Sequence, residues 1–302
     1  MTSTSTRSIN TRPLSIIQPC PQCARKGLAD YVVNVGLISI HGFTFAVGCD
    51  IVYPGLFREI AEEARTTDHH ARGLVQLCAT TDAWTPESRR LDIGRKCLES
   101  ILSHPLWSVR ILTKYAGVES DYDVIAWFRH RVLVGISLPA PPSKAGVIAA
   151  VEPQASTIPE RVAALKKAHE LGLRTYAMLS PVSPWVASDP KSLEELVEIG
   201  LNIGAEEFFV EPVNARGSAL VRIVQNLRGA GFFAEAEAVN RIRHRSAWSA
   251  YVVNLVSSLQ AILRQHHAVD KLRFLLHSSK LTPGDAAQLR RDDEGIVWLG
   301  KE

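Results

Sequence analysis

Two cysteines near the start of the chain form the first pattern with clear chemical potential. Cys20-Pro21-Gln22-Cys23 has the form of a turn that directs two thiolates toward one metal ion. A structural zinc site needs four ligands, usually from two such pairs, and this chain contains one pair. Two interpretations stay open: a metal site completed by Cys49 or a histidine, or two cysteines in an N-terminal extension.

Polar side chains that follow short apolar segments form a second set of candidates. Each of them could cap a helix or lie in a loop, but they recur where one predicted strand after another ends. Ligands of parallel α/β folds bind at the carboxyl ends of the strands, so we expect a binding site there. The members are Thr80, Thr81, Asp82, Lys114, Ser137, Ser180, Ser183, Glu211 and Asn214.

The elements that must position these residues alternate between strand and helix. Short apolar runs predict buried strands, and each is followed by a segment with helical periodicity. The strands are predicted at residues 31–35, 74–78, 108–112, 132–137, 175–179 and 207–210. Six such units predict an α/β fold with a parallel sheet, in the form of a partial (β/α)6 TIM-like barrel.

The predicted helices carry recognisable start signals. Thr85 before Pro86 predicts one helix that reaches about Leu102, and Thr157 with Glu160 forms a capping box that opens another. After residue 215 the pattern changes to helices at 220–230 and at 234–263, the latter with a break near Ser246, and to strands at 272–276 and 296–299. We therefore expect an N-terminal extension (1–30), a barrel (31–215) and a mainly helical C-terminal extension (216–302) that packs on the barrel.

Composition limits the class of protein. The chain has 302 residues, of which 46% are hydrophobic, so it can bury a full core. A net charge of +3 is too small to indicate nucleic-acid binding by itself. The uncharged run 31–49 approaches the length of a membrane span, but its polar residues and glycines favour a strand and a loop. We therefore expect a cytoplasmic protein without membrane contact.

Several segments resemble, in the right order, motifs of the radical S-adenosylmethionine (radical SAM) superfamily, and in particular its spore photoproduct lyase-like group. Residues 80–87, TTDAWTPE, resemble that group's T-x-D-x-Y-x-P-x-E segment, and residues 111–114 resemble its third-strand Thr-Lys. Glu152-Pro153 followed by Arg161 is similar to its E-P…R segment, and residues 180–184, SPVSP, to the turn after its fifth strand. The resemblance extends from about residue 31 to 214, some two thirds of the chain.

This resemblance implies a barrel that binds S-adenosylmethionine (SAM) and a [4Fe–4S] cluster over the strand ends. The implied cofactor-binding residues are Thr80, Thr81 and Asp82 near the methionine amino group, Ser137, Glu152 and Arg161 near the ribose and carboxylate, and Lys114, Ser180, Glu211 and Asn214. The alternative for Glu152 and Arg161 is a purely structural tie between a loop and its following helix.

Cys78 is a further candidate by the same resemblance. It lies one position away from the hydrogen-donating cysteine of spore photoproduct lyases. Because a shift of one residue reverses the face of a strand, we interpret Cys78 as a core residue.

The cluster ligands expected by the resemblance are missing. Superfamily members hold the cluster with three cysteines spaced C-x-x-x-C-x-x-C after the first strand, and the corresponding residues here are Ser39, Phe43 and Ala46. Serine is a poor ligand for iron, and phenylalanine and alanine have no atom that can bind it. We therefore predict a degenerate barrel, a pseudoenzyme that retains a nucleoside-cofactor pocket. The alternative is an active radical SAM enzyme whose cluster is held by Cys20, Cys23 and Cys49.

The loop around the missing ligands has a pattern of its own. Two β-rich segments, 37–40 and 43–47, flank His41-Gly42, which predicts a β-hairpin or an apolar plug with His41 as a turn residue. Asp68-His69-His70 could also bind a metal ion, but adjacent histidines diverge on most backbones, so we favour a solvated loop.

A third possible function is a non-catalytic interaction module. Arg241, Arg243, His244 and Arg245 form a basic run, predicted on a helix, that could touch nucleic acid. A solvated helix face explains the same residues. The expected partners are thus a small-molecule nucleoside cofactor and, on weaker grounds, nucleic acid.

Overall fold

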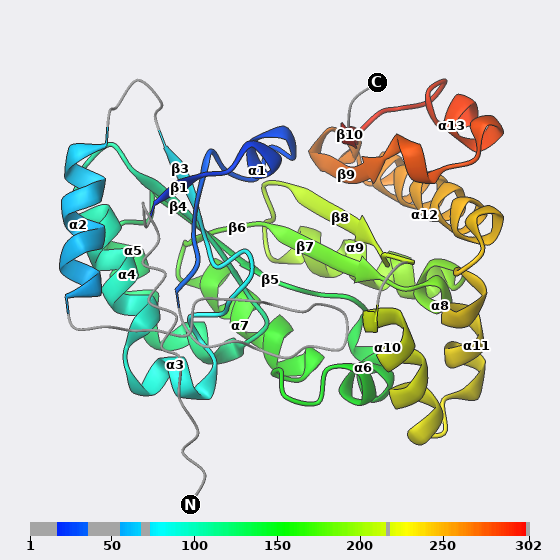
Figure 1. Ribbon diagram of the computed structural model, residues 1–302, viewed down its shortest axis with the longest axis horizontal. Coiled ribbons are helices and arrows are strands. Elements are labelled where there is room, and N and C mark those ends of the chain that lie inside the picture. The colour runs from blue at the N-terminus through cyan, green and yellow to red at the C-terminus, as the bar shows by residue number, and fades with distance from the viewer. Residues whose placement is uncertain (1–16, 36–54, 68–72, 216–217, 300–302) are drawn as a thin grey trace, which may run out of the picture.

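Two β-sheets with helices along their outer side form the protein. The structure, a computed structural model, describes residues 17–35, 55–67, 73–215 and 218–299. The sheets lie next to each other and follow one another along the chain (Figure 1). The mixed α/β class predicted from the alternating pattern is confirmed.

The first sheet contains six strands in sequence order. β1 pairs antiparallel with β2, and all further neighbours are parallel. The strands are β1 (Gln18–Pro19), β2 (Tyr31–Val33), β3 (Leu74–Leu77), β4 (Ser108–Thr113), β5 (Val132–Ile136) and β6 (Arg174–Thr175). The carboxyl ends of β2 to β5 therefore point to the same edge.

The second sheet continues the first with four parallel strands, in the order β10-β9-β8-β7. They are β7 (Ala177–Val182), β8 (Phe208–Pro212), β9 (Leu272–His277) and β10 (Ile296–Leu299). Leu138 N–H, just after β5, donates to the carbonyl of Met178 in β7 at 2.8 Å. This contact joins the two sheets into the wall of a partial barrel, which β9 and β10 extend.

The predicted fifth strand is divided in two, which the apolar pattern did not indicate. β6 stays on β5 and β7 leaves to pair with β8, with Tyr176 between them. The Tyr176 ring lies over Gly135, where a Cβ atom would come within 2.2 Å of the ring, and its hydroxyl donates to the carbonyl of Ile111. A large side chain inserted at the seam thus separates the two strands.

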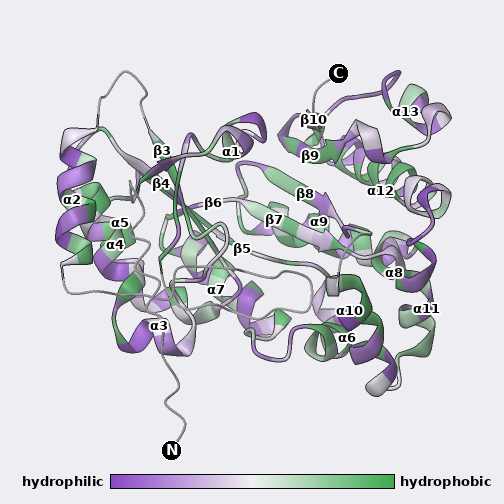
Figure 2. Ribbon diagram, viewed as in Figure 1, coloured by the Kyte–Doolittle hydropathy of each residue, from purple (hydrophilic) through white to green (hydrophobic). Residues whose placement is uncertain are grey.

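The helices lie between successive strands along the chain. They are α1 (Pro21–Arg25), α2 (Leu56–Thr66), α3 (Pro86–Arg90), α4 (Ile93–Leu102), α5 (Tyr122–Trp127), α6 (Ala145–Val151), α7 (Ile158–Glu170), α8 (Pro184–Ala187), α9 (Pro190–Asn202), α10 (Ser218–Gly229), α11 (Phe233–Arg241), α12 (Arg245–Gln265) and α13 (Pro283–Leu289). Short 3₁₀ turns are η1 (Ala116–Asp121), η2 (Pro142–Lys144), η3 (Val269–Lys271) and η4 (Ser278–Lys280). Most helices carry both hydrophilic and hydrophobic residues, as expected for an outer layer (Figure 2).

Two helix signals had different outcomes. The capping box is present: Thr157 N–H donates to Glu160 Oε2 at 2.7 Å, and Glu160 N–H donates back to Thr157 Oγ1. The single helix predicted from Thr85 to Leu102 is wrong, because the chain turns between α3 and α4. Asp92 has a φ of 53° there, which an α-helix does not allow.

The C-terminal part is mainly helical, as predicted, and its two strands lie where the sequence indicated them. α10, α11 and α12 lie between β8 and β9 in the chain, and β9 and β10 form the edge of the second sheet (Figure 1). The basic run does not lie on one helix, which corrects the prediction. α11 ends at Arg241, α12 begins at Arg245, and the residues between them form a turn.

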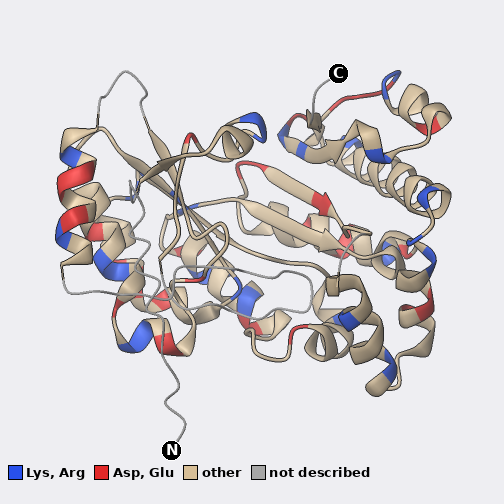
Figure 3. Cartoon of the chain, viewed as in Figure 1, with Lys and Arg blue, Asp and Glu red and all other residues tan. Residues whose placement is uncertain are grey.

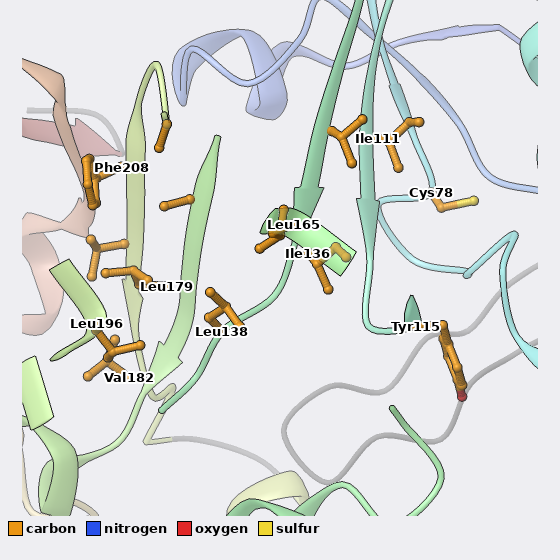
Figure 4. Close-up of a cluster of buried hydrophobic side chains, with 14 of the residues drawn as sticks. Cys78, Ile111, Tyr115, Ile136, Leu138, Leu165, Leu179, Val182, Leu196 and Phe208 are labelled. Carbon is orange, nitrogen blue, oxygen red and sulfur yellow. The ribbon is translucent and has the colours of Figure 1, made fainter. Parts of the chain in front are cut away.

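Buried apolar side chains from strands and helices form the core. Figure 4 shows Ile111 and Ile136 of the first sheet, Leu179 and Phe208 of the second, and Leu165 of α7 within it. A smaller cluster lies on the opposite face of the strands, where Tyr176, Phe209 and Leu275 pack with Cys23 and Leu28 around α1. The N-terminal segment therefore covers the inner face of the barrel wall.

Several predictions fall outside the described residues. They concern the hairpin at 37–47, the ligand positions Ser39, Phe43 and Ala46, the residue Cys49, and the segment Asp68-His69-His70. Within the described ranges, no helix has the length and apolar character needed to cross a bilayer.

Candidate functional site

Asp82 is the centre of a polar network at the carboxyl ends of β3 and β4. The Thr113 hydroxyl donates to its carboxylate at 2.8 Å, and the backbone N–H groups of Trp84 and Lys114 donate at 2.9 and 3.0 Å. Burial raises the pKa of Asp82 to about 6, although these donors work in the opposite direction. The carboxyl group can therefore change its protonation state near neutral pH.

The segment after Asp82 is held by its own side chains. Trp84 is buried, and its indole N–H donates to Asp121 at 2.9 Å. Thr85 Oγ1 accepts from Ser88 N–H at 3.0 Å and caps α3. The residues that carry the family resemblance here thus also have a structural role, since they fix the turn that places Asp82.

Glu152 is the centre of a second buried network. Its carboxylate accepts from Lys114 Nζ on one oxygen and from Arg161 Nη2, at 2.6 Å, on the other. Burial alone would raise the pKa of Glu152, but the charges of Lys114 and Arg161 outweigh it and lower the pKa to about 2. Glu152 is therefore a buried carboxylate anion held by two cations.

The guanidinium group of Arg161 donates hydrogen bonds to other groups of the protein. Besides Glu152, it donates through Nε to the carbonyl of Ser156 at 2.7 Å and through Nη1 to that of Ser137 at 3.0 Å. The side chain is fully buried. Arg161 thus makes the tie between a loop and its helix that we considered as the structural alternative.

The two threonines before Asp82 differ in exposure. Thr81 is buried and its hydroxyl donates to the carbonyl of Val35 at 2.9 Å, whereas Thr80 is exposed. Asn34 Oδ1 accepts from the backbone N–H groups of Ala79 and Thr80 at 2.9 and 2.8 Å. We did not select Asn34 from the sequence, although a single amide in the apolar run 31–35 was a detectable signal.

Cys78 follows β3 and lies in the hydrophobic core, where it is 3% exposed. Its thiol donates to the carbonyl of Val35, and burial together with the charge of Asp82 raises its pKa to about 12. The side chain is therefore a protonated thiol without access to solvent.

Ser180, Glu211 and Asn214 lie at the end of the second sheet, whereas the hydroxyl of Ser183 is buried and has no hydrogen-bond partner among the described residues. Ser180 Oγ donates to Glu211 Oε2 at 3.0 Å, and Lys26, which follows α1, donates to Glu211 Oε1 at 2.6 Å. Asn214 Oδ1 accepts from Lys280 at 3.5 Å. Neither lysine was selected from the sequence, because only the fold brings residues 26 and 280 to the exit of β8.

A cavity of about 200 Å³ lies beside this second group. Glu211 and Asn214 line it together with the ends of β9 and β10. The structure thus divides the predicted site residues into an inner network around Asp82 and Glu152 and a more exposed group at the cavity.

The predicted metal ligands Cys20 and Cys23 are bonded to each other in the structure. They form a disulfide with their Cα atoms 5.2 Å apart. In this state neither sulfur can act as a thiolate ligand. The part of the chain that the structure describes contains no group of three potential metal ligands, and Cys49, the third member of the predicted set, lies outside it.

Comparison with solved structures shows what this fold is similar to. Spore photoproduct lyase complexed with dinucleoside spore photoproduct superposes with a TM-score of 0.54 and 18% identity, over 72% of this chain and 65% of that chain. A mutant of the same enzyme with bound AdoMet and dinucleoside spore photoproduct gives a TM-score of 0.53 and 19% identity, over 70% and 63%. The fold is thus similar to that of spore photoproduct lyase, and this chain spans less than two thirds of that enzyme's length.

Comparison of sequences gives one further relative. An uncharacterized protein, ORF301, of Acidianus two-tailed virus is 28% identical over 215 residues, which are 68% of this chain and 66% of that protein. No family model matches the chain.

Proposed function

We propose that this protein is a radical-SAM-like barrel that binds SAM but does not carry out radical chemistry. The observation that carries the proposal is the polar network around Asp82 and Glu152 at the strand ends. It occurs in a fold similar to that of an enzyme solved with AdoMet. In radical SAM enzymes the cofactor, reduced through the cluster, supplies a carbon radical.

The proposed cofactor contacts follow the strand exits of the first sheet. Thr80 is exposed beside buried Asp82, so its hydroxyl can accept a hydrogen bond from the amino group of the cofactor. Glu152 and Arg161 act indirectly, because their charges are paired inside the protein and hold the loop that forms the edge. Ser137 supports the same edge through its carbonyl.

The degenerate character of the barrel rests on the residues at the cluster positions. Ser39, Phe43 and Ala46 provide no thiolate, and the described residues supply no substitute set. We therefore derive no catalytic step through a cluster.

Calorimetric titration of the full chain with SAM tests the proposed binding. We expect saturable heat from the wild type and weaker binding from Thr80→Ala, because a contact at the edge is lost. Thr66→Ala, an exposed threonine at the end of α2, serves as the matched control and should bind like the wild type. Absence of heat with millimolar SAM would contradict the proposal.

Anaerobic reconstitution with iron and sulfide after reduction tests the alternative of an active enzyme. A cluster held by Cys20, Cys23 and Cys49 would give visible thiolate-to-iron absorption that Cys49→Ser weakens. We expect no such absorption. Its appearance, together with its loss in the variant, would establish the atypical cluster instead.

A further inference from the structure

The Cys20–Cys23 disulfide has no part in the proposed binding of SAM, and its two halves lie in different environments. Cys23 is 8% exposed and belongs to the smaller apolar cluster around α1. Cys20 is only half-buried, and the two residues between the cysteines, Pro21 and Gln22, are exposed. The bridge is therefore more accessible to molecules in solution from the Cys20 side.

The groups around Cys20 suit a reactive sulfur. Its Sγ atom accepts a hydrogen bond from the backbone N–H of Cys23 at 3.2 Å. Arg25 Nε donates to the carbonyl of Pro21, the residue that follows Cys20, at 3.3 Å. Arg25 and Lys26 are the only charged residues between positions 18 and 29, and Figure 3 shows this positive charge at the end of α1. A donor N–H and nearby cations stabilise a thiolate.

The two free cysteines of the described residues have a different character. Cys78 and Cys97 are 3% and 0% exposed. Burial is the main cause that raises the pKa of both thiols, that of Cys78 to about 12. Both are therefore protonated at neutral pH, and a protonated thiol is a poor nucleophile. Among the four cysteines that the structure describes, Cys20 alone combines partial exposure with groups that stabilise a thiolate.

Contacts that do not involve sulfur hold the two cysteines in place. Cys20 N–H donates to the carbonyl of Asp30 at 2.9 Å, and Leu28 N–H donates to the carbonyl of Cys23 at 3.0 Å. Lys26 Nζ donates to Glu211 of β8 at 2.6 Å and ties the end of α1 to the second sheet. Because these contacts do not depend on the bridge, the two thiols stay adjacent when it is reduced and can form it again.

We propose that Cys20 and Cys23 form a thiol–disulfide exchange site for small thiols. The thiolate of one small thiol attacks Cys20 Sγ, the bond between the two cysteines breaks, and Cys23 leaves as a thiolate that takes up a proton. A second small thiolate attacks the sulfur of the first, which releases Cys20 as a thiolate that is protonated in turn. Two small thiols are thereby oxidised to one disulfide, and two electrons and two protons reduce the bridge.

Full-length variants with one cysteine of the pair test which sulfur reacts. Cys23→Ser retains Cys20, and Cys20→Ser retains the buried Cys23. With glutathione disulfide under native conditions, we expect Cys23→Ser to form the mixed disulfide at least about tenfold faster than Cys20→Ser. Peptide mass spectrometry assigns the modified residue and separates it from Cys49, and a metal chelator keeps the thiols free of metal ions. Far-ultraviolet circular dichroism shows that both variants are folded.

Equilibration of the wild-type chain with mixtures of reduced and oxidised glutathione tests reversibility. We expect the Cys20–Cys23 bridge to open and close with the composition of the mixture, without denaturant. Cys78 and Cys97 are internal controls in every sample and should stay unmodified, because they are buried.

Three results would overturn the proposal. The first is a bridge that small thiols reduce only after the chain is denatured. The second is a mixed disulfide that forms on Cys23 as fast as on Cys20. The third is modification of Cys78 or Cys97 at the rate of Cys20, since the reaction would then not depend on the environment of the pair.

Discussion

Arg161 Nη2 donates to Glu152 Oε2 at 2.6 Å, and both side chains are fully buried. The pair joins the end of α6 to the first half of α7 and, through the carbonyl group of Ser137 that Arg161 also contacts, to the exit of β5. A buried ion pair of this kind is costly to break, because removal of Arg161 leaves Glu152 with one of its two cations, Lys114, and takes a donor from the carbonyl groups of Ser137 and Ser156.

Replacement of Arg161 should therefore destabilise the protein strongly. We expect Arg161→Met to lower the free energy of unfolding by about 3–5 kcal/mol, measured by urea denaturation. Lys166→Met in the same helix is the control, and as an exposed substitution it should change stability by less than about 0.5 kcal/mol. Similar losses in the two variants would show that the pair does not stabilise the edge.

Asp82 should give the stability a distinct pH dependence. Its pKa rises from 3.8 unfolded to about 6 folded, so the folded state binds the proton more tightly. Stability from this group is present at low pH and is lost as the pH rises through about 4 to 6, by about 3 kcal/mol at most. Glu152 acts oppositely and loses its contribution as the pH falls toward about 2.

Denaturation curves between pH 4 and 7 check this expectation. Asp82→Asn removes the titrating group, so the stability difference between wild type and variant should change across this range. A constant difference at all pH values would mean that the pKa of Asp82 is not raised.

Gly94 should not tolerate a side chain. A Cβ atom at this position would lie 2.5 Å from the indole of Trp84, which is itself buried and hydrogen-bonded to Asp121. We expect Gly94→Ala to cost about 1–3 kcal/mol through overpacking, measured by thermal or urea unfolding. Gly146→Ala on α6 is the matched control, since nothing lies within 4 Å of its Cβ and a helix favours alanine.

The Cys20–Cys23 disulfide can be detected by mass spectrometry. Alkylation of the denatured, unreduced chain should label Cys78 and Cys97, which are free, and leave Cys20 and Cys23 unlabelled. The bridge closes a short loop, so Cys23→Ser should lower the free energy of unfolding by only about 2 kcal/mol. Labelling of all four residues without reductant would favour the metal site that we considered from the sequence.

Much of the fold could be predicted because its signals are local. The apolar run of β3, the capping box of α7 and the strand at 296–299 each depend on residues close together in the chain. The break between α3 and α4 depends on how Trp84 packs against Gly94, and the division of β6 from β7 on how Tyr176 packs over Gly135. Such long-range packing has no signature in a short segment.

The candidate site, too, was predictable in part from local sequence and in part only from the folded structure. The order of polar residues after successive strands was enough to predict that Asp82 and Lys114 meet at one edge, because parallel strands must end together. Tertiary structure alone decided which of these residues are paired inside the protein. It also brought Lys26 and Lys280 to the cavity that Glu211 and Asn214 line. Charge pairing depends on distances of a few ångströms between segments up to 185 residues apart, and only the folded chain sets those distances.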